Sequence, residues 1–134
     1  MLGNTKYITI EGAKKMMAAA EAEARKNNWN VAVAILDGGG HLLMFQKLDG
    51  TQPGSVKVAL GKATTAFNFK RPTKMMEEIA TSRPVFLAID GIVPVQGGLP
   101  VIVDDQLIGA VGVSGVKSAE DEQVAQAAIN ALAK

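Results

Sequence analysis

The chain of 134 residues contains no cysteine and a single histidine. The absence of cysteine excludes disulfides, zinc fingers and thiol chemistry, and it leaves the redox compartment open. Aromatic residues are also scarce, with four phenylalanines, one tryptophan and one tyrosine. No stretch approaches the roughly 20 apolar residues of a membrane-spanning helix, and no N-terminal run has signal-peptide character. We therefore expect a cytoplasmic protein without a membrane partner.

Charge is nearly balanced, with 14 lysines and arginines against 13 acidic residues and no basic run. This balance argues against nucleic acid as the main partner. Apolar residues make up 48% of the chain, which is enough to build a hydrophobic core. Length and composition together predict one domain spanning residues 1–134.

The middle of the chain has the clearest pattern. Val31–Leu36 is a short apolar run of β-forming residues, which predicts a buried strand. Asp37–Gly40 then supplies a hairpin turn, because glycine adopts the positive φ angles that such turns need. His41–Leu48 returns as a second strand. From Ser55 the period becomes helical, with a predicted apolar stripe of Val56, Leu60, Ala63 and Phe67.

Three further segments predict helices with recognisable starts. Thr9 is the expected N-cap of an alanine-rich helix over Ile10–Asn27. Thr73 is expected to cap a short helix that follows Pro72. Ser118 opens the last helix, and Asp121 three places on completes a variant of the capping box.

The remaining apolar segments predict three more strands, at Val85–Ile89, Leu99–Val103 and Gln106–Val113. Gly109 and Gly112 in the last strand indicate that a backbone or a helix packs closely against it. Five strands joined mostly by hairpins predict an antiparallel sheet, with helices available for both faces. The expected fold class is therefore α+β, a profilin-like three-layer α/β/α domain with a five-stranded antiparallel sheet.

Two glycine-rich stretches carry a family resemblance. They are Leu36–Leu42 followed by Lys47–Gly50, and Gly97–Val101 followed by Ile108–Gly115. Together with Lys62–Ala66 and Arg71–Thr73, they make the chain similar to the GlcG/HbpS family of haem-binding domains. That family includes the C-terminal domain of PduO-type cobalamin adenosyltransferases. The adenosyltransferase domain itself is absent from this sequence, so the resemblance does not imply that activity.

The resemblance implies a profilin-like domain that forms ring-like homo-oligomers, from tetramers to octamers. It also implies haem as a cofactor, with a role in haem degradation or redox sensing. Other members sit among catabolic genes, which supports a second hypothesis: a small enzyme or accessory protein that binds a small carboxylate beside the central helix. A third hypothesis is a non-catalytic assembly module. No catalytic constellation is evident, so the sequence leaves open whether the protein is an enzyme.

His41 is the natural candidate for an axial ligand of haem iron, because imidazole is a usual iron ligand. The alternative is that it only hydrogen-bonds the loop of its own hairpin. The cations Lys57, Lys62 and Arg71 belong to or follow the central helix, where they can meet carboxylates such as haem propionates. An ordinary solvated helix face is the alternative for the lysines.

Thr64 and Thr65 are unusual inside a helix, where threonine has poor propensity. Their hydroxyls can bond back to the backbone, line an interface or contact a ligand. Gly97 and Gly98 can leave backbone amides open to an anion, or they can simply form a turn. The candidate cofactor-binding residues are thus His41, Lys57, Lys62, Thr64, Thr65, Arg71, Gly97 and Gly98, with His41 as the metal ligand.

Overall fold

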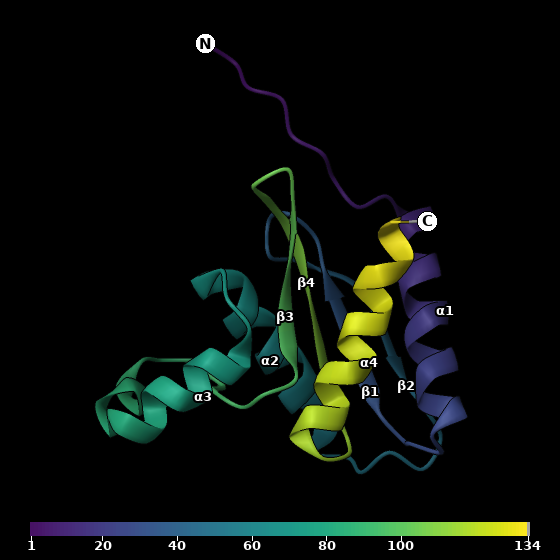
Figure 1. Cartoon of the computed structure of the whole chain (residues 1–134), viewed down its shortest axis with the longest axis vertical. Helices are drawn as coiled ribbons and strands as arrows, with labels where there is room; N and C mark the ends of the chain where they lie inside the picture. Colours follow the sequence, from purple (N-terminus) through teal and green to yellow (C-terminus); the bar gives the residue numbers. More distant parts are fainter. Residues whose placement is uncertain (134) are drawn as a thin grey trace.

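The computed structural model describes residues 1–133, in which helices pack on an antiparallel four-stranded sheet (Figure 1). The strand order across the sheet is β2-β1-β4-β3. In chain order, the elements are α1 (Ile10–Lys26), β1 (Ala32–Leu36), β2 (Leu42–Lys47), α2 (Ser55–Phe69), α3 (Thr73–Ser82), the 3-10 helix η1 (Pro84–Ala88), β3 (Gly98–Val103), β4 (Gln106–Ser114), α4 (Ser118–Asn130) and the 3-10 helix η2 (Ala131–Ala133). No helix of the described residues is long and apolar enough to cross a membrane.

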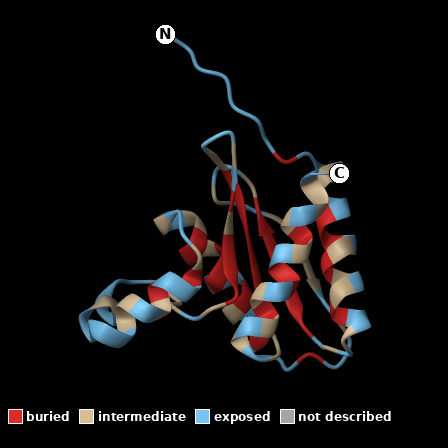
Figure 2. Cartoon of the chain, in the orientation of Figure 1, coloured by how far each residue is buried: buried red, intermediate tan, exposed pale blue. Residues whose placement is uncertain are grey.

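The helices lie on both faces of the sheet. α1 and α4 run side by side over one face, and α2 lies on the other (Figure 1). Figure 2 shows the buried residues concentrated in the sheet and on the helix surfaces that face it. This helix–sheet–helix layering agrees with the predicted α+β architecture.

The start of α1 follows the prediction closely. The hydroxyl oxygen of Thr9 accepts a hydrogen bond of 3.0 Å from the Gly12 amide, which satisfies one of the free N–H groups of the first turn. The preceding residue, Ile8, is buried against β4, where a Cβ on Gly109 would lie 2.7 Å from Ile8 Cδ1. The predicted close approach at Gly109 is therefore confirmed.

The predicted hairpin is also confirmed. β1 is buried along its whole length and pairs with β2 in a register that places Ala34 opposite Phe45. The turn between them is closed by Asp37, whose Oδ1 accepts hydrogen bonds from the amides of Gly39 at 2.9 Å and His41 at 3.0 Å. A side chain that satisfies two turn amides explains why aspartate stands at the first position of the turn.

The predicted strand at Val85–Ile89 is wrong, and the sheet has four strands rather than five. The segment forms η1, in which the Ile89 amide bonds to the Phe86 carbonyl at 3.1 Å. Val85 and Leu87 are each 62% exposed, so no strand lies beside them to complete a ladder. Pro84 starts the 3-10 helix, because its ring fixes φ in the helical range and it has no N–H to donate to a sheet.

The packing of α2 corrects the predicted apolar stripe. Val56 and Leu60 stay 36% and 38% exposed, and smaller side chains form most of the buried side of the helix. The reason is the short distance between α2 and β4, since a Cβ on Gly112 would collide with the backbone of Ala59 and Ala63. Large side chains cannot fit in that space. The predicted exclusion of bulk at Gly112 is thus confirmed, while two of the four stripe residues face outward.

Two predicted caps are wrong. Thr73 and Ser118 are the first residues of their helices, and neither hydroxyl caps the helix that it opens. At α4 the carboxylate of Glu120 accepts a hydrogen bond of 3.2 Å from the Lys117 amide. Asp121, the predicted partner in the capping box, is instead buried with 2% of its surface exposed. Thr73 and Asp121 instead make tertiary hydrogen bonds, to Gly98 and Lys62, that local sequence does not reveal.

Candidate functional site

A buried ion pair joins α2, β4 and α4. The Lys62 ammonium donates to Asp121 Oδ2 at 2.9 Å and to the carbonyl of Val113 at 3.0 Å. Both charged residues are only 2% exposed. The second carboxylate oxygen of Asp121 accepts a hydrogen bond of 3.1 Å from the Val116 amide. The pair thus holds α2 and α4 to the C-terminal end of β4.

Burial controls the electrostatics of this pair. It raises the pKa of Asp121, and the ammonium of Lys62 and the amide of Val116 oppose the rise. Such a pair needs well-placed hydrogen bonds, because removing two charges from water is costly. The bonds to Lys62 and Asp121 meet that need and leave the two charges enclosed by the protein.

Gly97 and Gly98 form the wall against which Lys62 packs. A Cβ on Gly97 would lie 2.7 Å from Lys62 Nζ and 3.0 Å from Asp121 Cβ, and its φ of 134° favours glycine. A Cβ on Gly98 would lie 2.9 Å from Thr73 Cγ2. The Gly98 amide donates to the Thr73 hydroxyl at 2.8 Å. Gly98 is the first residue of β3, and its amide is occupied by Thr73, so it is neither part of a turn nor open to an anion. The close packing of both glycines against Lys62 was not predicted.

The two unusual threonines of α2 have different partners. Thr64 bonds back to its own helix, with its hydroxyl 2.9 Å from the Leu60 carbonyl. Thr65 is buried and accepts a hydrogen bond of 2.9 Å from the Val93 amide. Thr65 therefore helps to fix the loop that leads into β3.

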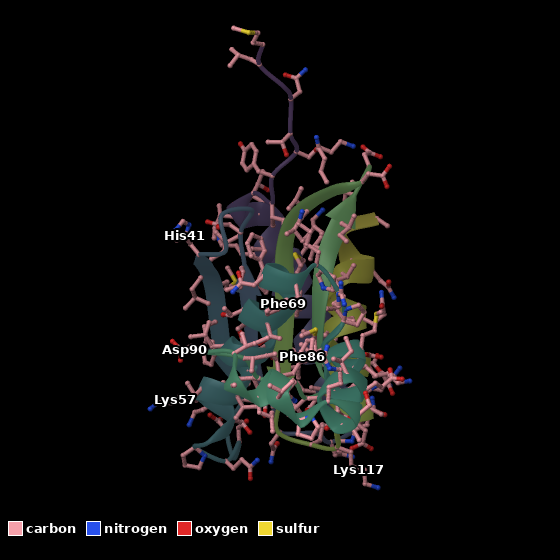
Figure 3. The ribbon with its side chains drawn as sticks, turned by 90° about the vertical axis from the view of Figure 1, so that its left-hand side faces the viewer. His41, Lys57, Phe69, Phe86, Asp90 and Lys117 are labelled. Carbon is pink, nitrogen blue, oxygen red and sulfur yellow. The ribbon has the colours of Figure 1, made fainter. Side chains whose placement is uncertain are left out.

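His41 lies at a different place, on the hairpin between β1 and β2. Its side chain is 82% exposed, and Nδ1 lies 3.6 Å from Asp37 Oδ1. Figure 3 shows the imidazole at the margin of the molecule, toward the end from which the N-terminal segment extends. The base of the hairpin borders a cavity of about 550 Å³, lined by Thr5–Ile10, Asp37, Gly38, Gly39, Leu43 and Leu107.

The remaining predicted cations are placed apart from one another. Arg71 follows the C-terminal end of α2, the end whose Phe67 ring packs against Gly40 of the hairpin. Lys57 belongs to the first turn of α2 and lies far from His41 in Figure 3. Phe67 lies ten positions further along the helix, a rise of roughly 15 Å. The structure therefore gathers Lys62, Gly97 and Gly98 in the interior and does not bring Lys57 to the hairpin.

Sequence reasoning missed the partner of Lys62, which is Asp121, because that residue also fits a helix start. One available indication was the position of Lys62 between Ala59, Ala63 and Ala66, on a side of α2 too small for solvated chains. Among the described residues, no group of three or more histidine, aspartate or glutamate side chains is arranged to hold a metal ion.

Comparisons with known proteins agree with this architecture. A sequence model of the family described as "Haem degrading protein HbpS-like" matches residues 8–130. Protein GlcG of Escherichia coli strain K12 is 45% identical over 108 residues, which are 80% of this chain and 81% of GlcG. A double mutant of Streptomyces reticuli HbpS has a crystal structure similar to this chain, with a TM-score of 0.88 and 32% identity over 96% of this chain and 89% of that one. The PduOC–haem complex shares the fold, with a TM-score of 0.87, 24% identity and coverage of 94% and 95%.

Proposed function

Because the chain belongs to the HbpS-like family of haem-degrading proteins, we propose that it binds haem and acts in haem degradation or redox sensing. The observation that carries the proposal is the exposed imidazole of His41 on the hairpin whose residues Gly38 and Gly39 line an apolar cavity. A domain of the same fold has been crystallised as a haem complex, which supports the choice of ligand.

The residues at the hairpin fit the group. The imidazole of His41 would supply a nitrogen ligand to the iron, a common ligand of haem iron in proteins. Ile8, Leu43 and Leu107 give the neighbouring cavity apolar walls suited to a porphyrin face. Lys6 lines the same cavity, and its ammonium forms an exposed ion pair with Asp104 at 2.6 Å, which a propionate would have to replace. Bound haem would supply the redox-active iron, while these residues would orient it and exclude water.

A haem titration followed by the Soret band tests this proposal. Wild-type protein should bind haem saturably, and His41→Ala should weaken binding and change the spectrum. His41→Met should keep an axial ligand with a different spectrum. Lys57→Ala serves as the matched control, because it removes an exposed cation far from the hairpin. Saturable binding with an identical spectrum in His41→Ala would contradict this site, and no binding by wild type would contradict the function.

We further infer that the protein assembles into homo-oligomers, from tetramers to octamers. The support is a set of exposed apolar side chains on α2, α3, η1 and the loop after it, which we term the α2–η1 surface: Val56, Leu60, Met75, Val85, Leu87 and Ile89. Figure 3 looks onto this side of the molecule, with Phe86 of η1 near its centre. Exposed apolar side chains grouped on neighbouring elements are typical of protein interfaces.

Light scattering tests the assembly. Wild type should have a mass several times the 14.0 kDa of one chain. Leu87→Asp should reduce that mass, because it places a charge in the α2–η1 surface. Ile102→Asp is the matched control, since Ile102 is also an exposed apolar residue but belongs to edge strand β3. A monomeric wild type at micromolar concentration would contradict the assembly. If only Ile102→Asp reduced the mass, the interface would lie at β3 and not at the α2–η1 surface.

A further inference from the structure

We propose that a second cavity, at the opposite end of β1 from His41, binds a small zwitterion of the α-amino-acid type. The cavity has a volume of about 230 Å³ and lies where α1 ends and β2 ends. Its lining residues are Arg25, Asn28, Trp29, Asn30, Leu48 and Asp49. A volume of this size is below the usual range for drug-sized ligands and suits a molecule of few heavy atoms.

Two opposite charges line the cavity without contacting each other. Arg25 donates from Nε to Glu21 at 2.7 Å, and its terminal amino groups make no hydrogen bond within residues 1–133. Over the same residues, the Asp49 carboxylate forms no ion pair and accepts no hydrogen bond. A ligand that carries both a carboxylate and an ammonium would satisfy Arg25 and Asp49 together. The terminal nitrogens of arginine match a carboxylate in bidentate geometry.

The other lining residues suit the uncharged parts of such a ligand. Trp29 is half-buried and packs against the main core, which gives the cavity a fixed apolar wall beside Leu48. The side-chain amides of Asn28 and Asn30 make no hydrogen bonds to other described residues. They are therefore available to orient a bound polar group.

The walls of the cavity are held by the backbone. The Trp29 amide donates to the Ala24 carbonyl at 2.8 Å, and the Leu48 amide donates to the Val31 carbonyl at 3.0 Å. Asn28 has a φ of 59°, the left-handed conformation that ends α1 and turns the chain toward β1. The backbone around the cavity is therefore held in place, while the Arg25 side chain, which is 68% exposed, would become ordered on binding.

Trp29 is the only tryptophan of the chain, so its fluorescence reports on this cavity directly. We would titrate wild-type protein with glycine, L-serine and L-leucine, and follow Trp29 emission and calorimetric heat. At least one amino acid should bind saturably. Its amide, which lacks the carboxylate, and its deaminated acid, which lacks the ammonium, should each bind about ten- to a hundredfold more weakly.

Matched variants separate the two charges from general effects. Arg25→Gln should abolish the preference for the amino acid over its amide. Asp49→Asn should abolish the preference for the amino acid over its deaminated acid. Lys26→Gln and Asp105→Asn change exposed charges outside the cavity and should leave affinity unchanged. Circular dichroism of each variant checks folding, and Arg25→Met replaces Arg25→Gln if Arg25→Gln is unfolded.

Three results would overturn the proposal. The first is the absence of saturable binding for all three amino acids, and the second is equal affinity for an amino acid and its amide. The third is an affinity that neither Arg25→Gln nor Asp49→Asn changes. A response to glucose that these two variants leave unchanged would indicate a polyol site instead. The test does not depend on haem, because the two sites lie at opposite ends of β1.

Discussion

Replacing Asp121 by alanine tests the buried ion pair directly. The substitution leaves the Lys62 ammonium enclosed, with the Val113 carbonyl at 3.0 Å as its remaining partner. It also removes the acceptor of the Val116 amide. Breaking a buried pair by removing one partner typically costs about 3–5 kcal/mol, because an uncompensated charge stays inside the protein.

A loss of that size is a large part of the roughly 5–15 kcal/mol that stabilises an ordinary domain. For a chain of this length, it corresponds to a fall in Tm of about 10–20 °C. Asp121→Asn keeps the shape and one oxygen acceptor, but it leaves the ammonium without a counter-charge and turns an NH2 group toward a donor, so its cost should also be about 3 kcal/mol. The double variant Lys62→Met with Asp121→Leu removes both charges and should recover most of the stability lost in Asp121→Ala.

Urea unfolding followed by circular dichroism gives the free energies of unfolding, and unchanged m-values show that the same surface is exposed in each variant. Glu122→Ala is the matched control, because it removes a carboxylate of α4 that takes part in no ion pair of the described residues. The reasoning fails if Asp121→Ala costs less than about 1 kcal/mol, the range of a solvent-exposed pair. It also fails if the double variant is as unstable as Asp121→Ala.

Two further predictions concern the packing of β4 and the hairpin. Gly112→Val should cost about 1–3 kcal/mol by overpacking, whereas Gly54→Ala should be nearly neutral because a Cβ there meets nothing within 4 Å; equal melting temperatures would contradict this. Hydrogen bonds from the amides of His41 and Gly39 lower the pKa of Asp37. Its contribution to stability is therefore complete above the ordinary pKa near 3.8 and is lost as pH falls through the lowered value. Amide exchange of His41 should rise over that acidic range in wild type but show no such transition in Asp37→Ala, and a persisting transition would assign the titration to another group.

The parts of the fold that depend on neighbouring residues could be predicted from sequence. The Thr9 cap, the Asp37 turn and the strand pair around it are local, because each is specified within a few residues. The segment Val85–Ile89 has the composition of a strand but not the surroundings of one. Whether it forms a strand depends on whether a sheet edge lies beside it, and Pro84 was the one local indication against a strand.

The interior of the candidate site could not be predicted for a related reason. Lys62 and Asp121 are 59 positions apart in sequence, and each has a plausible role on its own helix. A lysine on a helix is usually solvated, and an aspartate near a helix start usually interacts with the helix dipole. Only the packing of α2 and α4 at the end of β4 brings the two side chains together. Gly97 and Gly98 were predicted to form a turn or an anion site, and their close packing against Lys62 was not predicted.

The close packing of α2 on β4 also bears on assembly. Because Gly112 admits the backbone of α2, the inward side of that helix holds only small residues and Lys62, while Val56 and Leu60 face outward. A helix in contact with water on its outer side normally carries polar residues there. The exposure of Val56 and Leu60 supports the proposed assembly, in which a second subunit would cover them. Leu87 of η1 belongs to the same exposed apolar set, which is why a single charge at that position is expected to separate the subunits while the close contact at Gly112 stays intact.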